Sequence, residues 1–115
     1  RRERALALYD LNEGQRAETE LRALAEQASA AHGPDSFEAC RAETELVALL
    51  IKRGQLEESL RRAQHGLVQA QRLGDAELLE TAQNNLGFAL LESSRFPEAE
   101  AQLEAVLASR RARLG

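Results

Sequence analysis

The chain is 115 residues long, the size of one domain, and its residues are 43% hydrophobic, 30% charged and 3% aromatic. Because alanine and leucine supply 21 and 20 residues while valine, isoleucine and threonine together supply seven, the composition favours helices and excludes a β-sandwich, a barrel or a disordered chain. The net charge is −4, and residues 5–109 hold nine basic and eighteen acidic side chains, which argues against nucleic-acid binding because that needs a basic surface.

Apolar spacing predicts six helices, which in chain order are residues 2–12, 16–31, 36–53, 56–72, 76–93 and 97–113. Asp35 is expected to cap the third helix, with Glu38 completing a capping box, and Asp75 is expected to cap the fifth. Pro97 falls in the first turn of the sixth helix, where its missing N–H costs nothing. These residues therefore lie where helical hairpins need them.

Residues that end helices recur at a fixed period. Gly14, Gly54 and Ser94 follow one another at intervals of 40 residues. A second series is spaced by 41 residues and consists of Gly33, Gly74 and Gly115. Two interleaved series of this kind predict helix–turn–helix units stacked in line, with repeats at about 1–40, 41–80 and 81–115.

Two strings in the third unit resemble a known repeat. Residues 85–90 read Asn-Leu-Gly-Phe-Ala-Leu, and residues 94–99 read Ser-Arg-Phe-Pro-Glu-Ala. They resemble the tetratricopeptide repeat family, with Leu90 in place of an aromatic residue and Ser94 in place of a glycine. The family's standard unit has 34 residues, and the longer period here resembles its kinesin-light-chain-like branch, which is abundant in bacterial signalling and regulatory proteins.

The resemblance implies an all-α solenoid of about three repeats, with six antiparallel helices in a right-handed superhelix. We expect residues 1–115 to form one domain of this kind. The chain starts without methionine and both ends fall within the repeating pattern, so we also expect a fragment of a longer, bacterial protein. The single cysteine suits a reducing compartment, and no apolar run approaches the roughly 18 residues that cross a bilayer, so we expect a cytoplasmic protein without membrane contact.

The resemblance also implies that the first helix of each unit lines a concave groove. An asparagine there suits the main chain of an extended peptide because its amide both donates and accepts hydrogen bonds. Basic side chains there suit acidic side chains of a ligand. The alternative is that these are ordinary solvated residues on a helix face. The groove residues that the family's positions imply are Arg4, Leu8, Arg41, Thr44, Ala48, Lys52, Thr81, Asn84 and Phe88.

Catalysis is not expected from this sequence. Cys40 has no second cysteine or placed histidine nearby, and His32 and His65 have no metal-ligating residue at a suitable spacing. No phosphate-binding glycine loop or Ser-His-Asp set is present in the sequence, so no cofactor and no metal are expected.

Two functions follow as hypotheses. The first is a protein-interaction scaffold that binds a peptide or helix of a partner in the groove, as part of a larger signalling or regulatory protein. The second is self-association as a homodimer, in a multidomain regulator or enzyme whose activity lies outside these residues. The last helix is expected to expose an apolar face for this contact, formed by Leu103, Val106 and Leu107.

Overall fold

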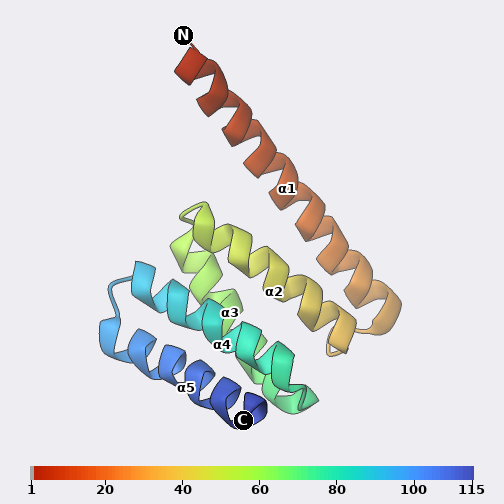
Figure 1. Cartoon of the computed structure of the whole chain (residues 1–115). Coiled ribbons are helices and arrows are strands. Elements are labelled where there is room, and N and C mark those ends of the chain that lie inside the picture. The colour runs from red at the N-terminus through yellow and green to blue at the C-terminus, as the bar shows by residue number, and fades with distance from the viewer. Residues whose placement is uncertain (1) are drawn as a thin grey trace.

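The computed structural model describes the backbone of residues 2–115 and the side chains of residues 13–115. Within that range the chain is helical and contains no strand, as the composition predicts. The helices, in chain order, are α1 (Arg2–His32), α2 (Phe37–Lys52), α3 (Leu56–Leu73), α4 (Ala76–Glu92) and α5 (Phe96–Leu114) (Figure 1).

The predicted turn at Gly14 is wrong. Helix α1 runs without interruption through this residue, so five helices stand where six were predicted, and the separate helices at 2–12 and 16–31 are one. A glycine inside a helix costs only about 1 kcal/mol relative to alanine, and the residues around it are good helix formers, so the helix continues. The other four predicted helices agree with α2 to α5 within one or two residues.

The turns after α2 and α4 share one geometry, as the 40-residue spacing predicts. Gly54 has a φ of 75° and Ser94 a φ of 60°, both in the left-handed region. The next residue in each turn donates its backbone N–H five residues back, from Gln55 to Leu50 (3.0 Å) and from Arg95 to Leu90 (2.8 Å). These turns close two helical hairpins, α2–α3 and α4–α5.

Of the two aspartates predicted to cap helices, one does so in the structure. Asp75 caps α4 by accepting a hydrogen bond from the backbone N–H of Leu78 at 2.9 Å. Asp35 does not cap α2, because that helix begins one residue later than predicted. Ser36 is the cap instead, accepting from the N–H of Ala39 at 3.1 Å.

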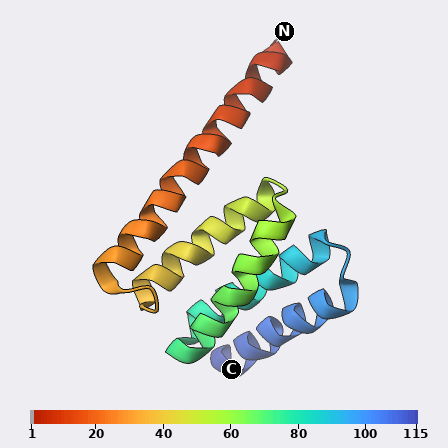
Figure 2. The same cartoon turned by 180° about the vertical axis from the view of Figure 1, so that it is seen from behind.

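Successive helices pack against one another, and α2 also lies beside α4, so the two hairpins stack. Figure 2 shows the same order from behind, with the N-terminal half of α1 lying clear of α3, α4 and α5 in both views. The units predicted at 41–80 and 81–115 thus each contain most of one hairpin, whereas the unit predicted at 1–40 holds α1 and only the start of α2. That the chain forms one domain stays a prediction.

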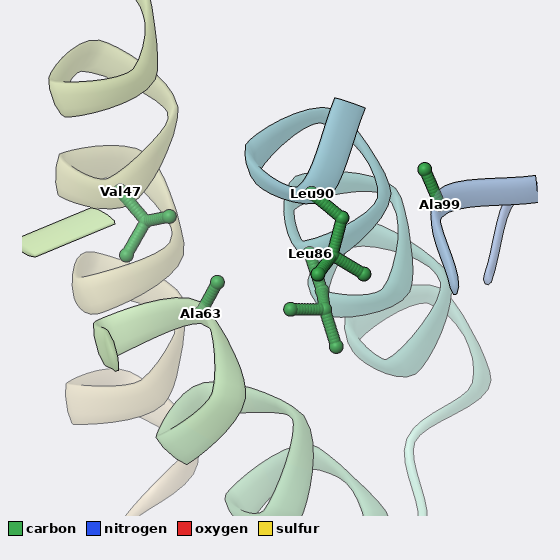
Figure 3. Close-up of a cluster of buried hydrophobic side chains, with 5 residues drawn as sticks. All are labelled: Val47, Ala63, Leu86, Leu90 and Ala99. Carbon is green, nitrogen blue, oxygen red and sulfur yellow. The ribbon is translucent and has the colours of Figure 1, made fainter. Parts of the chain in front are cut away.

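The main core cluster joins four helices. Its members are all at most 6% exposed, and they come from α2, α3, α4 and α5 (Figure 3). A single hairpin could not bury these side chains alone, which is the reason that repeats of this type are stable only when stacked. The members are Val47, Ala63, Leu86, Leu90 and Ala99.

Gly87 lies at a close contact between α4 and α5. A Cβ atom on this residue would lie 2.7 Å from Cδ2 and 2.8 Å from Cγ of Leu103. We expect Gly87→Ala to lower the free energy of unfolding by about 1 kcal/mol, because an overpacking cost of about 1–3 kcal/mol exceeds the gain in helix propensity. Urea unfolding monitored by circular dichroism measures this change.

Gly66 in α3 provides the matched control. It is also buried within a helix, but no atom lies within 4 Å of a Cβ built there. Gly66→Ala should therefore raise the free energy of unfolding, by up to about 1 kcal/mol. Equal stabilisation by both substitutions would show that Leu103 moves aside freely and would contradict the close approach.

Candidate functional site

A hollow of about 370 Å³ lies between α2 and α4. It brings together three of the residues implied for the groove, Arg41, Thr44 and Thr81. Residues from the start of each helix line it, because α2 and α4 lie side by side with their first turns at the same end. The full lining is Phe37, Arg41, Thr44 and Glu45 from α2, and Asp75, Glu77, Leu78 and Thr81 from the cap and start of α4.

The other residues implied for the groove lie farther along the same helices. Ala48 and Lys52 follow Thr44 by four and eight residues, so they lie on the same side of α2. Asn84 is half-buried, and Phe88 is 43% exposed. None of these four lines the hollow itself. Arg4 and Leu8 lie outside the residues whose side chains the structure describes.

Thr44 is a structural residue at the base of the hollow. Its hydroxyl donates to the carbonyl oxygen of Arg41 at 2.7 Å, and its own carbonyl oxygen accepts from the side-chain amide of Asn85 at 3.0 Å. The residue is only 5% exposed. Thr44 therefore connects α2 to α4 through its carbonyl oxygen, and its contact with a ligand stays a prediction.

Asn85 is the asparagine that the sequence interpretation missed. It is buried, and its amide joins the two hairpins through the carbonyl of Thr44. The signal was present, because Asn85 begins the family-like string at residues 85–90. Asn84, one residue earlier, stays at the border of the exposed face.

The charge in the hollow is mixed and mainly acidic. Glu45, Asp75 and Glu77 contribute carboxylates, and Arg41 contributes the single guanidinium. Asp75 is already engaged as the cap of α4. Phe37, which is 39% exposed, adds an accessible aromatic ring at the edge. The hollow can therefore bind a ligand that has both an apolar side chain and polar main-chain or side-chain groups.

A network of ion pairs joins α1 to the α2–α3 hairpin. Arg22 donates to both carboxylate oxygens of Glu58, at 2.9 and 2.8 Å, and to Glu18 at 3.1 Å. Glu18 also accepts from Arg53 at 3.1 Å. Arg62 donates to Glu58 at 2.8 Å. The hydrogen bond from Arg22, and to a smaller extent the one from Arg62, lowers the pKa of Glu58 to about 2. The same bond between Arg22 and Glu58 raises the pKa of Arg22.

A second hollow, of about 410 Å³, lies beside this network, with Arg22, Glu43 and Arg62 in its wall. Its arginines already bind carboxylates: Arg22 binds Glu58, and Arg62 binds Glu43. The first pair connects α1 to α3, and the second connects α3 to α2. The sequence interpretation missed the network, although the pairs Glu18/Arg22 and Glu58/Arg62 recur at the 40-residue offset.

The exposed face expected on α5 is only partly present. Val106 is 3% exposed, and Leu103 is half-buried against α4 beneath Gly87, whereas Leu107 is 54% exposed. The prediction is therefore wrong for Val106, because α5 turns this residue into the interface with α4. Leu107 and Leu114 are the exposed leucines at the end of α5.

Glu80 anchors the end of α5 from α4. Its side chain is 5% exposed and accepts hydrogen bonds from Arg113 at 2.7 Å and Ser109 at 3.0 Å. The bond from Arg113 and the bond from Ser109 lower the pKa of this carboxyl. One of the terminal arginines therefore holds the helix in place.

The surroundings of Cys40 disfavour a nucleophilic thiolate. The residue is 1% exposed, and burial together with the charge of Glu43 raises the pKa of its thiol, so the reactive thiolate is disfavoured. Among residues with described side chains, no three His, Cys, Asp or Glu side chains gather closely enough to hold a metal ion. No helix in the described range is long and apolar enough to cross a membrane.

Comparison with known proteins gives one match. The sequence model of a family described as "Tetratricopeptide repeat" matches residues 38–112, which run from the first turn of α2 to near the end of α5. No curated protein and no solved structure matches the chain.

Proposed function

The chain belongs to the tetratricopeptide repeat family, whose repeats generally mediate protein–protein interaction, and on that premise we propose a non-catalytic scaffold that binds a peptide or helix of a partner between α2 and α4. The observation that carries the proposal is the hollow of about 370 Å³ that three of the implied groove residues line. We further propose that the module acts in the cytoplasm, within a larger bacterial signalling or regulatory protein.

The chemistry of the hollow supports capture by shape and a few polar contacts. Phe37 and Leu78 offer apolar surface to a ligand side chain. We expect Arg41 to bind an acidic side chain of the ligand. We expect Asn84, eight residues before the last residue of α4, to bind a peptide main chain along the same face. The scaffold then contributes orientation and affinity, and it takes no part in bond making or breaking.

Self-association through α5 is the weaker of the two candidate functions. Leu103 and Val106 already pack toward α4, so Leu107 and Leu114 are left as the exposed leucines at this end. Arg110 and Arg111 flank them. A surface of this composition resembles a solvated helix end more than an apolar interface core.

A peptide array tests the groove. Peptides selected on the wild-type protein are titrated against an Arg41→Glu, Asn84→Ala variant, which is expected to bind at least about tenfold more weakly, because each lost contact contributes roughly 1 kcal/mol. The control carries Arg61→Glu and Gln64→Ala on the exposed side of α3 and should bind as the wild type does. Equal affinities for all three proteins would remove the groove as the binding site.

A further inference from the structure

One stripe of side chains on α4 extends from the hollow toward the end of the helix. Its members are spaced by three or four residues, so they lie on one side of the helix. Glu77 and Thr81 line the hollow, and the stripe continues past it almost to the last residue of α4. The stripe consists of Glu77, Thr81, Asn84, Phe88 and Leu91.

Helix α2 supplies the other wall beside this stripe. Arg41 lines the hollow, and Ala48 and Lys52 follow it by seven and eleven residues on the same side of α2. Helix α3 packs against both helices from the other side, since it lies behind α4 in Figure 1 and in front of it in Figure 2. No residue of α3 lines the hollow. We call this surface the α2–α4 groove: the hollow together with Ala48, Lys52, Asn84, Phe88 and Leu91.

The α2–α4 groove has an apolar subsite beyond the hollow, formed by Phe88 and Leu91. These side chains are 43% and 39% exposed, whereas Leu86 and Leu90 on the other sides of α4 are 6% and 3% exposed. Phe88 and Leu91 are three residues apart, so they are neighbours on the helix surface. The α2 residue 40 positions before Phe88 is the small Ala48. A bulky apolar side chain of a ligand would therefore remove two large apolar side chains from water at once.

Two carboxylates in the hollow are available to a ligand. Among the residues whose side chains are described, Glu45 and Glu77 form no ion pair. Arg113 lies near Glu77 but donates its hydrogen bond to Glu80 at 2.7 Å. Glu80 and Glu58, which hold helices together, differ from this pair because both accept bonds from arginines. A basic side chain in the hollow would give Glu45 and Glu77 charge-assisted hydrogen bonds.

The distance between the hollow and the apolar subsite sets the spacing on the ligand. Glu77 and Phe88 are eleven residues apart on one helix, which corresponds to about 16 Å along its axis. An extended peptide advances about 3.3 Å per residue, so about five residues span this distance. Asn84 lies between the two sites, where its amide suits the main chain of such a peptide.

We infer that the α2–α4 groove binds an extended segment with a basic side chain in the hollow and a bulky apolar side chain about four to six residues away, on the apolar subsite. This inference rests on the proposed function and specifies its ligand. Arg41 is still expected to bind an acidic side chain, so the segment carries charges of both signs near the hollow. Three carboxylates and one guanidinium line the hollow, so complementarity of charge requires the basic side chain.

Selection from random peptides tests this ligand chemistry. A phage-displayed library of peptides of about ten residues is selected on the 115-residue chain. Enriched peptides should carry lysine or arginine about four to six residues from a large apolar residue. Enriched peptides that lack a basic residue, but bind the Arg41→Glu, Asn84→Ala variant more weakly, would overturn this inference and leave the proposed function standing. No enrichment, or equal binding to that variant, would remove both.

Charge reversal tests the two carboxylates. Glu45→Lys with Glu77→Lys should weaken binding of a selected peptide at least about tenfold, and a peptide with glutamate in place of its basic residue should recover affinity for this variant alone. The control, Glu57→Lys with Glu104→Lys, makes the same change of charge at exposed positions of α3 and α5 and should bind as the wild type does. Equal weakening by both variants would show that net charge, and not the hollow, attracts the peptide, and would overturn the inference.

Phe88→Ala tests the apolar subsite. It removes most of the apolar surface that the ligand covers there, so the selected peptide should bind about tenfold more weakly. Val68→Ala, at a similarly exposed apolar position on α3 (44% exposed), should leave the affinity unchanged. Circular dichroism checks that both variants fold as the wild type does. An unchanged affinity for the folded Phe88→Ala variant would overturn the inference.

Discussion

Replacement of Leu90 by alanine is expected to lower the free energy of unfolding by about 2–5 kcal/mol. Leu90 is 3% exposed and belongs to the cluster that joins α2, α3, α4 and α5. The substitution removes the transfer free energy of the buried carbons and leaves a cavity that its neighbours only partly fill. Such a loss is a large part of the total stability of a domain, which is usually 5–15 kcal/mol.

The effect of Leu90→Ala should reach both hairpins. Val47 and Ala63 come from the first hairpin of the cluster, and Leu86 and Ala99 come from the second. Because adjacent repeats stabilise each other through their shared interface, hydrogen exchange should become faster in α3 as well as in α4 and α5. Exchange that accelerates in α4 and α5 alone would show that the first hairpin is stable by itself.

Leu91 is the matched control for Leu90. It is the next residue of the same helix and has the same side chain, but it is 39% exposed. Leu91→Ala should therefore change the free energy of unfolding by no more than about 1 kcal/mol. Urea unfolding of the two variants compares them directly, and similar losses would contradict the burial pattern of α4.

Replacement of Glu58 by glutamine is expected to lower the free energy of unfolding at pH 7 by about 1–2 kcal/mol. The pKa of about 2 for Glu58, against an ordinary value of 4.5, corresponds to roughly 3 kcal/mol at most. Side-chain exposures of 22% for Glu58 and 34% for Arg22 allow water to screen the pair, so the expected loss is smaller. The loss should appear as loosening of α1, which Arg22 ties to α3.

The pH dependence identifies the carboxylate as the cause. Because the pKa of Glu58 is lower in the folded state, its contribution is complete above about pH 4.5 and disappears as the pH falls toward about 2. Wild type and Glu58→Gln should therefore converge in stability over this interval. A difference that stays constant from pH 7 to pH 2 would mean that packing, and not charge, is responsible.

Glu57→Gln is the control for this experiment. Glu57 is the neighbouring residue and is exposed in the first turn of α3. Its substitution should change stability by no more than about 0.5 kcal/mol at any pH.

The helix ends that sequence predicted well are those with a local cause. Gly54, Gly74 and Ser94 adopt positive φ, and Asp75 caps a helix through its own side chain. Such signals depend on a few consecutive residues, so they can be read without knowing the fold. Gly14 carried the same signal but is compatible with a helix as well, so its conformation depends on what lies beside it.

Part of the candidate site could also be predicted from sequence, and part could not. The period and the family-like strings placed Arg41, Thr44 and Thr81 on facing helices, and the structure brings them to one hollow. Sequence could not distinguish the buried Asn85 from the half-buried Asn84, because one residue on a helix turns the side chain by about 100°. The rotation of each helix about its axis is set by packing with its neighbours.

Sequence alone therefore determined that this chain is helical, that its hairpins repeat about every 40 residues, and that it belongs with tetratricopeptide repeats, because propensity, turns and period are properties of short segments. Only the tertiary structure decided that Arg22 reaches Glu58, that Val106 faces inward and that α1 continues through Gly14. Those outcomes depend on contacts between residues far apart in the chain, where the stacking of one helix on another settles which of several locally acceptable arrangements has the lower free energy.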